Sequence, residues 1–148
     1  MGYTSKNQGH FNPRHPEKYV GDLSKIRFMS SWELHMDKFL DDNPNILRWS
    51  SEEISIPYVK PTDGKVHKYW PDYWVEFKNK HGEIVQEIWE VKPSTQIKQP
   101  KTRGKKKKTQ IRESVTYAVN VAKWAAATQF CNKYNLKFRL ISENAMFK

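Results

Sequence analysis

The stretch YWPDYWVEFKNKHGEIVQEIWEVK, residues 69–92, decides the fold and carries the chemistry expected of this chain. Two runs of aromatic and aliphatic residues flank a short turn-forming segment at 78–82, which predicts two strands joined by a hairpin. Glu90 and Lys92 stand two residues apart on the second strand, and they share a face because successive side chains alternate. Asp72 lies on the first strand. We therefore expect two carboxylates and one ammonium group to meet at one edge of a sheet.

The composition limits the class of protein. The chain has 148 residues, a net charge of +10 and 14% aromatic residues. This length predicts one domain with one core, and the basic excess favours a polyanionic partner, with nucleic acid ahead of an anionic membrane. No apolar run approaches the ~20 residues that span a bilayer, and no apolar signal segment is present, so we expect an intracellular protein without membrane contact. Cys131 is the only cysteine and is expected to be a buried small hydrophobic residue.

The N-terminal part of the chain divides into an arm and the first helix. Residues 1–28 show no hydrophobic period and are predicted to form an arm, for which wrapping over the surface and disorder are equally compatible with the sequence. Residues 29–148 are predicted to form a single domain. Ser30 and Glu33 have the spacing of a capping box, which predicts a helix that ends before Asn43 and Pro44. Taken alone, Glu33 has the simple role of capping its own helix.

Three strands, a long helix and a last strand should follow. Alternation begins at Ile46 and reaches Tyr58, an Asp-Gly turn comes next, and the second and third strands are expected over 68–77 and 83–91. A helix is expected over about 109–134, with a left-handed cap at Asn135 and a strand at 136–141. Its buried stripe is predicted to contain Ile111, Val115, Ala118, Ala122, Ala125 and Gln129. The fold class is α/β, in the order α-β-β-β-α-β, with a mixed central sheet flanked by helices because strand-helix-strand crossovers return parallel.

A basic segment follows the third strand. Residues 94–108 have neither hydrophobic period nor core residues and are predicted to form a mobile basic loop. The residues expected to bind DNA phosphates are Lys98, Lys101, Arg103, Lys105, Lys106, Lys107 and Lys108. A loop that is merely solvated is the rival interpretation. Phosphate contacts would make affinity fall steeply with salt.

The predicted cluster suits a divalent metal. Mg²⁺ prefers oxygen ligands and is often held by one or two carboxylates together with substrate phosphates. Asp72 and Glu90 meet that requirement, and the backbone carbonyl of Val91 is a natural third ligand. Lys92 would then stabilise the anionic transition state or assist deprotonation. The competing interpretation is an exposed ion pair between Glu90 and Lys92, which would not require Asp72.

These residues resemble a known superfamily. Glu33 on the first helix, the Pro71-Asp72 pair, the tripeptide 90–92 and the element order are similar to the PD-(D/E)xK nucleases, which have a restriction-endonuclease-like core. The chain as a whole resembles the head completion proteins of T4-like tailed bacteriophages. The segments that carry this resemblance are NQGHFNPRHPEKYVGD, RFMSSWE, WSSEEISIPY, WEVKP and YAVNVAKWAAA, which fall within residues 7–130.

The resemblance implies a site and a role. Glu33, Asp72, Glu90 and Lys92 take the catalytic positions, and Glu33 joins Asp72, Glu90 and the Val91 carbonyl at the metal, directly or through a water. The implied cofactor is Mg²⁺, with Mn²⁺ as a substitute.

The implied partners are DNA and the capsid and portal-neck proteins of a phage, and a homodimer is one option. The implied protein works in the host cytoplasm during assembly and in the head-neck region of the virion. There it would cut the packaged DNA end before tail attachment. The alternatives are a structural head-neck protein that needs no catalysis, a TnsA-like nuclease that cuts transposon ends, and a plain DNA-binding module.

Overall fold

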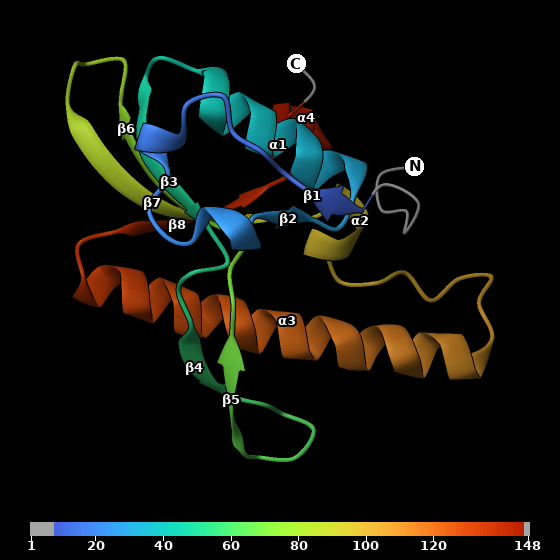
Figure 1. The fold of residues 1–148 in the computed structure, drawn as a ribbon. Coiled ribbons are helices and arrows are strands. Elements are labelled where there is room, and N and C mark those ends of the chain that lie inside the picture. The colour runs from blue at the N-terminus through green and yellow to red at the C-terminus, as the bar shows by residue number, and fades with distance from the viewer. Residues whose placement is uncertain (1–7, 147–148) are drawn as a thin grey trace.

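A central sheet with one helix on each face forms the body of the protein. The computed structural model describes residues 8–146, and the sheet order is β3-β6-β7-β8. Helix α1 covers one face of this sheet and α3 covers the other (Figure 1). The bounds of these elements are α1 Ser31–Asp42, β3 Ile46–Ser51, β6 Tyr73–Lys78, β7 Ile84–Val91, α3 Lys107–Lys133 and β8 Lys137–Ile141. The predicted α-β-β-β-α-β order is therefore confirmed.

The sheet is mixed, as expected. β6 pairs antiparallel with both β3 and β7, whereas β8 pairs parallel with β7. Helix α3 is the crossover between these two parallel strands. In the register of the predicted hairpin, Tyr73 lies opposite Trp89. The residues just before Tyr73 therefore come close to Glu90 and Val91, and this register positions the candidate site.

The first two predicted strands are each broken in two, which corrects the expected boundaries. β4 (Ile56–Val59) and β5 (Val66–Tyr69) form a separate hairpin that packs on α3 and extends away from the central sheet (Figure 1). β3 ends before Glu52, whose φ of 54° is incompatible with a continuing strand. β5 ends before Pro71, which has no N–H for a strand ladder. Asp72 therefore lies in a bend just ahead of β6 and not within a strand.

The described part of the predicted arm is docked on the domain. Phe11 and Tyr19 are buried and Ile26 is fully buried in the core cluster beneath α1. The elements here are β1 Gly9–His10, the 3-10 turns η2 Pro16–Lys18 and η3 Leu23–Lys25, and β2 Arg27–Phe28, with β1 and β2 paired antiparallel. Residues 1–7 of the predicted arm lie outside the described residues.

The basic segment is more regular than expected. Its start forms the short helix α2 (Ser94–Ile97), which is tied to the last short helix, α4 (Glu143–Met146), because the Ser94 N–H donates to Glu143 Oε1 at 2.8 Å. The remaining irregular segment is 98–106, because Lys107 and Lys108 already belong to α3. None of the helices within residues 8–146 is long and apolar enough to cross a bilayer.

The buried side of α3 differs from the predicted stripe. Ile111 and Val115 are 55% and 43% exposed, whereas Ala127 and Cys131 pack against the sheet. The N-terminal half of α3 extends past the sheet and runs below the basic segment (Figure 1). It therefore has no core to cover. The prediction that Cys131 is buried is confirmed at 1% exposure.

Candidate active site

Two carboxylates meet where β6 begins and β7 ends. The Asp72 N–H donates to Glu90 Oε1 at 3.3 Å, and the Val91 N–H donates to Asp72 Oδ2 at 2.8 Å. The Tyr69 hydroxyl donates to the same Glu90 oxygen at 2.8 Å. Each predicted carboxylate is thus held by the backbone beside the other, and Glu90 is only 7% exposed.

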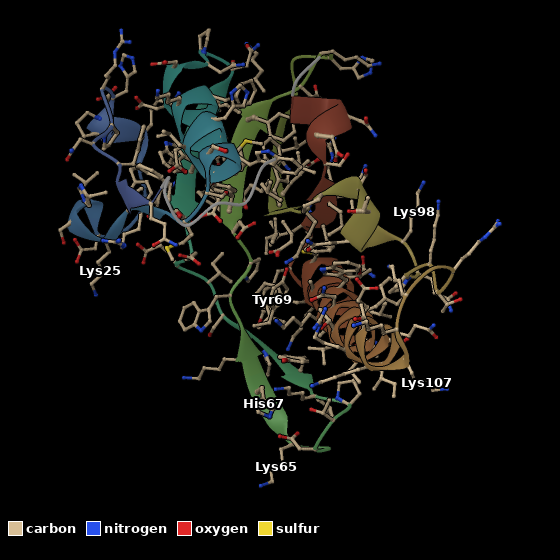
Figure 2. All side chains as sticks on the ribbon, turned by 90° about the vertical axis from the view of Figure 1, so that its right-hand side faces the viewer. Lys25, Lys65, His67, Tyr69, Lys98 and Lys107 are labelled. Atoms are coloured by element: carbon tan, nitrogen blue, oxygen red, sulfur yellow. The ribbon has the colours of Figure 1, made fainter. Side chains whose placement is uncertain are left out.

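The bend that carries Asp72 is held by three neighbouring segments. The Asp72 carbonyl accepts the Glu52 N–H at 3.0 Å, which ties the bend to the end of β3. Tyr69, at the end of β5, lies at the base of the hairpin, with His67 and Lys65 further out along it (Figure 2). The run Trp70-Pro71 between β5 and β6 therefore turns Asp72 toward Glu90.

Burial and mutual repulsion raise the pKa values of this pair. The pKa of Asp72 lies well above its usual value, first because the carboxyl is desolvated and then because the charges of Glu90 and Glu33 are close. Desolvation also raises the pKa of Glu90, while Lys92 and the Tyr69 hydrogen bond oppose the rise. Two adjacent buried acids that resist joint ionisation favour a cation between them.

Lys92 completes the tripeptide as predicted. Its Nζ lies 3.7 Å from Glu90 Oε2, and its side chain is 23% exposed. Its N–H donates to the Ile141 carbonyl at 3.0 Å, so β8 holds the backbone just past the end of β7. The ammonium group is thus fixed beside Glu90 but remains open to a substrate.

Glu33 reaches the same site from α1. The Ser30 hydroxyl accepts the Glu33 N–H at 3.2 Å, so the predicted N-cap is confirmed, and the Glu33 carboxylate accepts the Met29 N–H at 3.1 Å. Desolvation raises the pKa of Glu33, and the charges of Glu52 and Glu90 act in the same direction. Glu33 is therefore electrostatically coupled to the pair while its carboxylate also holds the Met29 N–H just ahead of the helix.

The donor set fits Mg²⁺ with two carboxylates. No group of three histidine, cysteine or acidic side chains suited to a metal occurs among residues 8–146, so Glu33 is not gathered as a third direct ligand. The Val91 N–H points at Asp72, and the carbonyl of the same strand residue points to the same side. Asp72, Glu90 and the Val91 carbonyl are therefore the groups that could offer oxygen ligands to one divalent ion, and they would leave its other positions to phosphate and water, as Mg²⁺ prefers.

Three charged residues that lie near this site were not identified from the sequence. Asp37 on α1 is fully buried, and its Oδ1 accepts the Tyr73 hydroxyl at 2.6 Å. Glu52 stands in the left-handed region, and its charge acts on both Glu33 and Asp37. No local pattern identifies either acid as part of the site.

Lys123 is the third residue, and the sequence did contain a signal for it. Its pKa is lowered, first by burial and then by the charge of Lys92, while Glu90 opposes the change. Its Nζ lies 5.6 Å from the centre of the Tyr69 ring. Lys123 is a charged residue in an alanine-rich helical segment, and such an isolated charge marks a side chain directed at a polar site.

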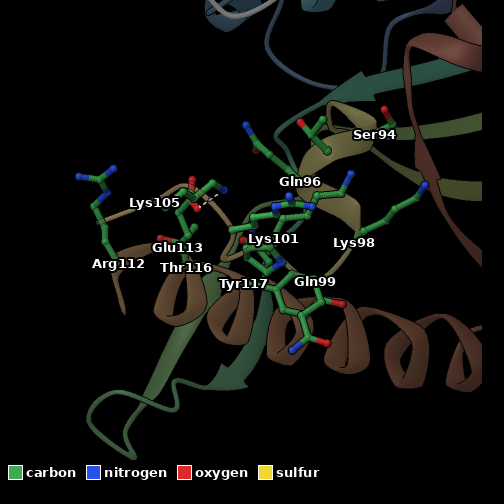
Figure 3. A pocket seen from close by; sticks show the side chains of 14 residues that line it. Ser94, Gln96, Lys98, Gln99, Lys101, Lys105, Arg112, Glu113, Thr116 and Tyr117 are labelled. Atoms are coloured by element: carbon green, nitrogen blue, oxygen red, sulfur yellow. Dashed lines mark hydrogen bonds and ion pairs between the residues drawn. The ribbon is translucent and has the colours of Figure 1, made fainter. Parts of the chain in front are cut away.

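The basic segment forms one wall of a cavity whose lining begins at Ser94, two residues beyond Lys92. The cavity has a volume of about 670 Å³ and lies between the α2 side of the segment and α3 (Figure 3). The predicted DNA-binding residues that line it are Lys98, Lys101, Arg103 and Lys105. Lys105 is paired with Glu113 at 2.6 Å, whereas Lys106, Lys107 and Lys108 do not line the cavity.

Comparisons with known proteins agree on the class of chemistry. A sequence model of the family described as TnsA-like endonuclease N terminal matches residues 43–143, a range that includes Asp72, Glu90 and Lys92 but not Glu33. The chain is 35% identical over 152 residues to the "Head completion nuclease" of Enterobacteria phage T4, a match that covers 99% of this chain and 95% of that protein. No solved structure matches the chain.

Proposed function

The chain belongs to the TnsA-like endonuclease family and is a relative of the phage T4 head completion nuclease, and on that premise we propose that it is a Mg²⁺-dependent deoxyribonuclease of phage head completion. The observation that carries the proposal is the buried pair of Asp72 and Glu90 beside Lys92. Such a pair costs folding energy unless a cation neutralises it. A catalytic role of the two carboxylates explains why the fold accepts this cost in folding energy.

The geometry suits hydrolysis of a phosphodiester. Asp72, Glu90 and the Val91 carbonyl would hold Mg²⁺, which supplies Lewis-acid stabilisation of charge on the scissile phosphate when bound. Lys92 would orient the attacking water and stabilise the negative charge that develops on the phosphate. Tyr69 keeps Glu90 in place through its 2.8 Å hydrogen bond. Glu33 would contact the ion through a water. Its charge acts on Asp72, but its side chain does not form a group of three metal ligands with Asp72 and Glu90.

The proposed substrate is the end of the packaged DNA. The name of the T4 relative and the +10 charge of this chain support an enzyme that works on DNA in the head-neck region of a virion, after packaging and before tail attachment. Capsid and portal-neck proteins would be its partners, and the host cytoplasm is where assembly would take place. A homodimer would allow both strands to be cut.

A TnsA-like role at transposon ends is the second candidate. It is favoured by the family model over residues 43–143. The phage role is preferred because the T4 relative matches 99% of the chain, including the docked N-terminal segment that lies outside the family match.

A cleavage assay tests the proposal. The full chain is incubated with plasmid and linear DNA, with Mg²⁺ and with EDTA, beside the variants Asp72→Asn and Glu90→Gln. We expect metal-dependent cleavage by the unaltered protein, loss of at least about 10²-fold in either variant, and unchanged DNA binding. Glu76→Gln is the matched control, since Glu76 lies on β6 but pairs with Arg48 outside the site. Cleavage by Glu90→Gln at the rate of the unaltered protein would refute the assignment.

A further inference from the structure

The cavity beside the active site has the size of a ligand site. Its volume of about 670 Å³ lies within the ~300–1,000 Å³ that small-molecule sites usually occupy. α2 and the basic segment form one side, and α3 forms the other (Figure 3). α2 begins at Ser94, two residues beyond Lys92, so the cavity opens next to the catalytic tripeptide.

The charges in the cavity select an anionic ligand. Lys98, Lys101 and Arg103 line it from the segment, and Arg112 lines it from α3. The only acid in the lining is Glu113, which Lys105 already neutralises. A phosphate group would therefore meet several cations and no free carboxylate.

Asn120 shows that the cavity is suited to more than a phosphate. Asn120 is 8% exposed and lines the cavity, so its side-chain amide is held by the surrounding structure and faces this space. An amide both donates and accepts hydrogen bonds, which suits a ligand with polar edges. Tyr117, one turn earlier on the same helix, supplies an aromatic ring to the cavity (Figure 3). A ring and an amide together suit a nucleobase, which stacks on one and hydrogen-bonds with the other.

A row of polar side chains on α3 connects this cavity to the active site. Arg112, Thr116, Asn120 and Lys123 follow one another at spacings of three or four residues and so share a face. Lys123 already interacts with Lys92 and Glu90. Tyr117 lies about 9 Å before Lys123 along the helix, at ~1.5 Å per residue, which is about three nucleotides of one strand at ~3.4 Å each.

From these observations we propose that the cavity binds one unpaired nucleotide of the DNA strand, about three nucleotides from the cut, with the base on Tyr117 and Asn120 and its phosphate on Arg112 and the lysines. The proposal rests on the proposed nuclease function and names its substrate class. The enzyme would act on ends that carry a single-stranded tail, in preference to blunt duplex.

Binding without metal tests this proposal separately from cleavage. The full chain in EDTA is titrated into three labelled duplexes, and fluorescence anisotropy reports the affinity. One duplex is blunt, one carries a four-nucleotide single-stranded tail, and one carries a tail of the same length that lacks bases. We expect the normal tail to bind about 5- to 100-fold more tightly than the blunt end, and the tail without bases to lose most of that gain.

Two variants identify the residues. Tyr117→Ala and Asn120→Leu should each lose the preference for the normal tail and should bind the tail without bases as before. Tyr117→Leu serves as a less disruptive second variant, and Tyr134→Ala is the control, because Tyr134 is exposed at the opposite end of α3. Equal affinity for the two kinds of tail would overturn the proposal, since the cavity would then read phosphates alone. The proposed function fails by a different result, namely absence of Mg²⁺-dependent cleavage on all three duplexes.

Discussion

At the scale of one residue, Asp37 shows how a buried acid near the site lowers the free energy of unfolding. It is fully buried, and its Oδ2 has no hydrogen-bond partner within residues 8–146. Burial raises the pKa of Asp37 to about 8, and the charges of Glu33 and Glu52 contribute to the rise. The folded state therefore binds a proton between about pH 4 and 8 that the unfolded chain releases, and the free energy of unfolding falls as pH rises through this window.

Asp37→Asn should flatten this pH dependence. The amide keeps an acceptor for the Tyr73 hydroxyl but cannot ionise, so the variant avoids a cost that the unaltered protein incurs above pH 8, on the order of 5 kcal/mol at most. Urea unfolding at pH 5 and pH 8.5 measures the difference. Asp42→Asn, at the exposed end of the same helix, should leave it unchanged. An equal loss of stability with pH in Asp37→Asn and the unaltered protein would contradict the explanation.

Lys92 is the residue that would act on the substrate directly. Its ammonium group lies 3.7 Å from Glu90 Oε2 and stays partly exposed, so it can reach a phosphate. Lys92→Met should lower the cleavage rate by about 10²- to 10³-fold, because it removes charge stabilisation in the transition state. Single-turnover kinetics measure this effect, and DNA affinity should change by less than about fivefold. Lys78→Met, at the other end of the hairpin, is the control, and a normal rate in Lys92→Met would exclude the assigned role.

At the scale of elements, α3 has two halves with different tasks. Its C-terminal half fills the core with Ala127 and Cys131, while its N-terminal half lines the cavity with Thr116 and Asn120. The basic segment lies over the N-terminal half of α3 and has no hydrophobic side chain that anchors it to the core. Lys98 and Lys101, unlike Lys105, are therefore available to DNA.

The basic segment should determine the salt dependence of DNA binding. Each phosphate contact contributes a slope of about −0.9 to a plot of log affinity against log salt concentration. The double variant Lys98→Gln/Lys101→Gln should therefore reduce the slope by about 2. Titrations of duplex DNA at several salt concentrations measure it. Lys78→Gln/Lys80→Gln removes the same charge at the opposite end of the sheet and should leave the slope nearly unchanged; an equal effect of both pairs would mean that only net charge matters.

At the scale of the whole molecule, the sequence predicted what depends on local pattern. Periodicity and spacing sufficed for the element order, the Ser30 cap and the meeting of Asp72, Glu90 and Lys92. The break at Glu52 was not predictable, because a positive φ at a glutamate leaves no sequence signal. On α3 the predicted stripe was right at Ala122, which packs against the core, and wrong at Ile111 and Val115, because the N-terminal half of the helix extends past the sheet and periodicity cannot show where a helix leaves the core.

The N-terminal segment has a consequence for the whole particle. β3 is one of the two edge strands of the central sheet, and the Val20 N–H donates to the Trp49 carbonyl of β3 at 2.8 Å while Tyr19 packs against the Trp49 ring. An uncovered outer strand is a template on which other chains can add. A copy that lost this segment would keep Asp72 and Glu90 yet would tend to aggregate through β3. The same residues that complete the fold thus also occupy part of the β3 edge, on which another chain could otherwise add.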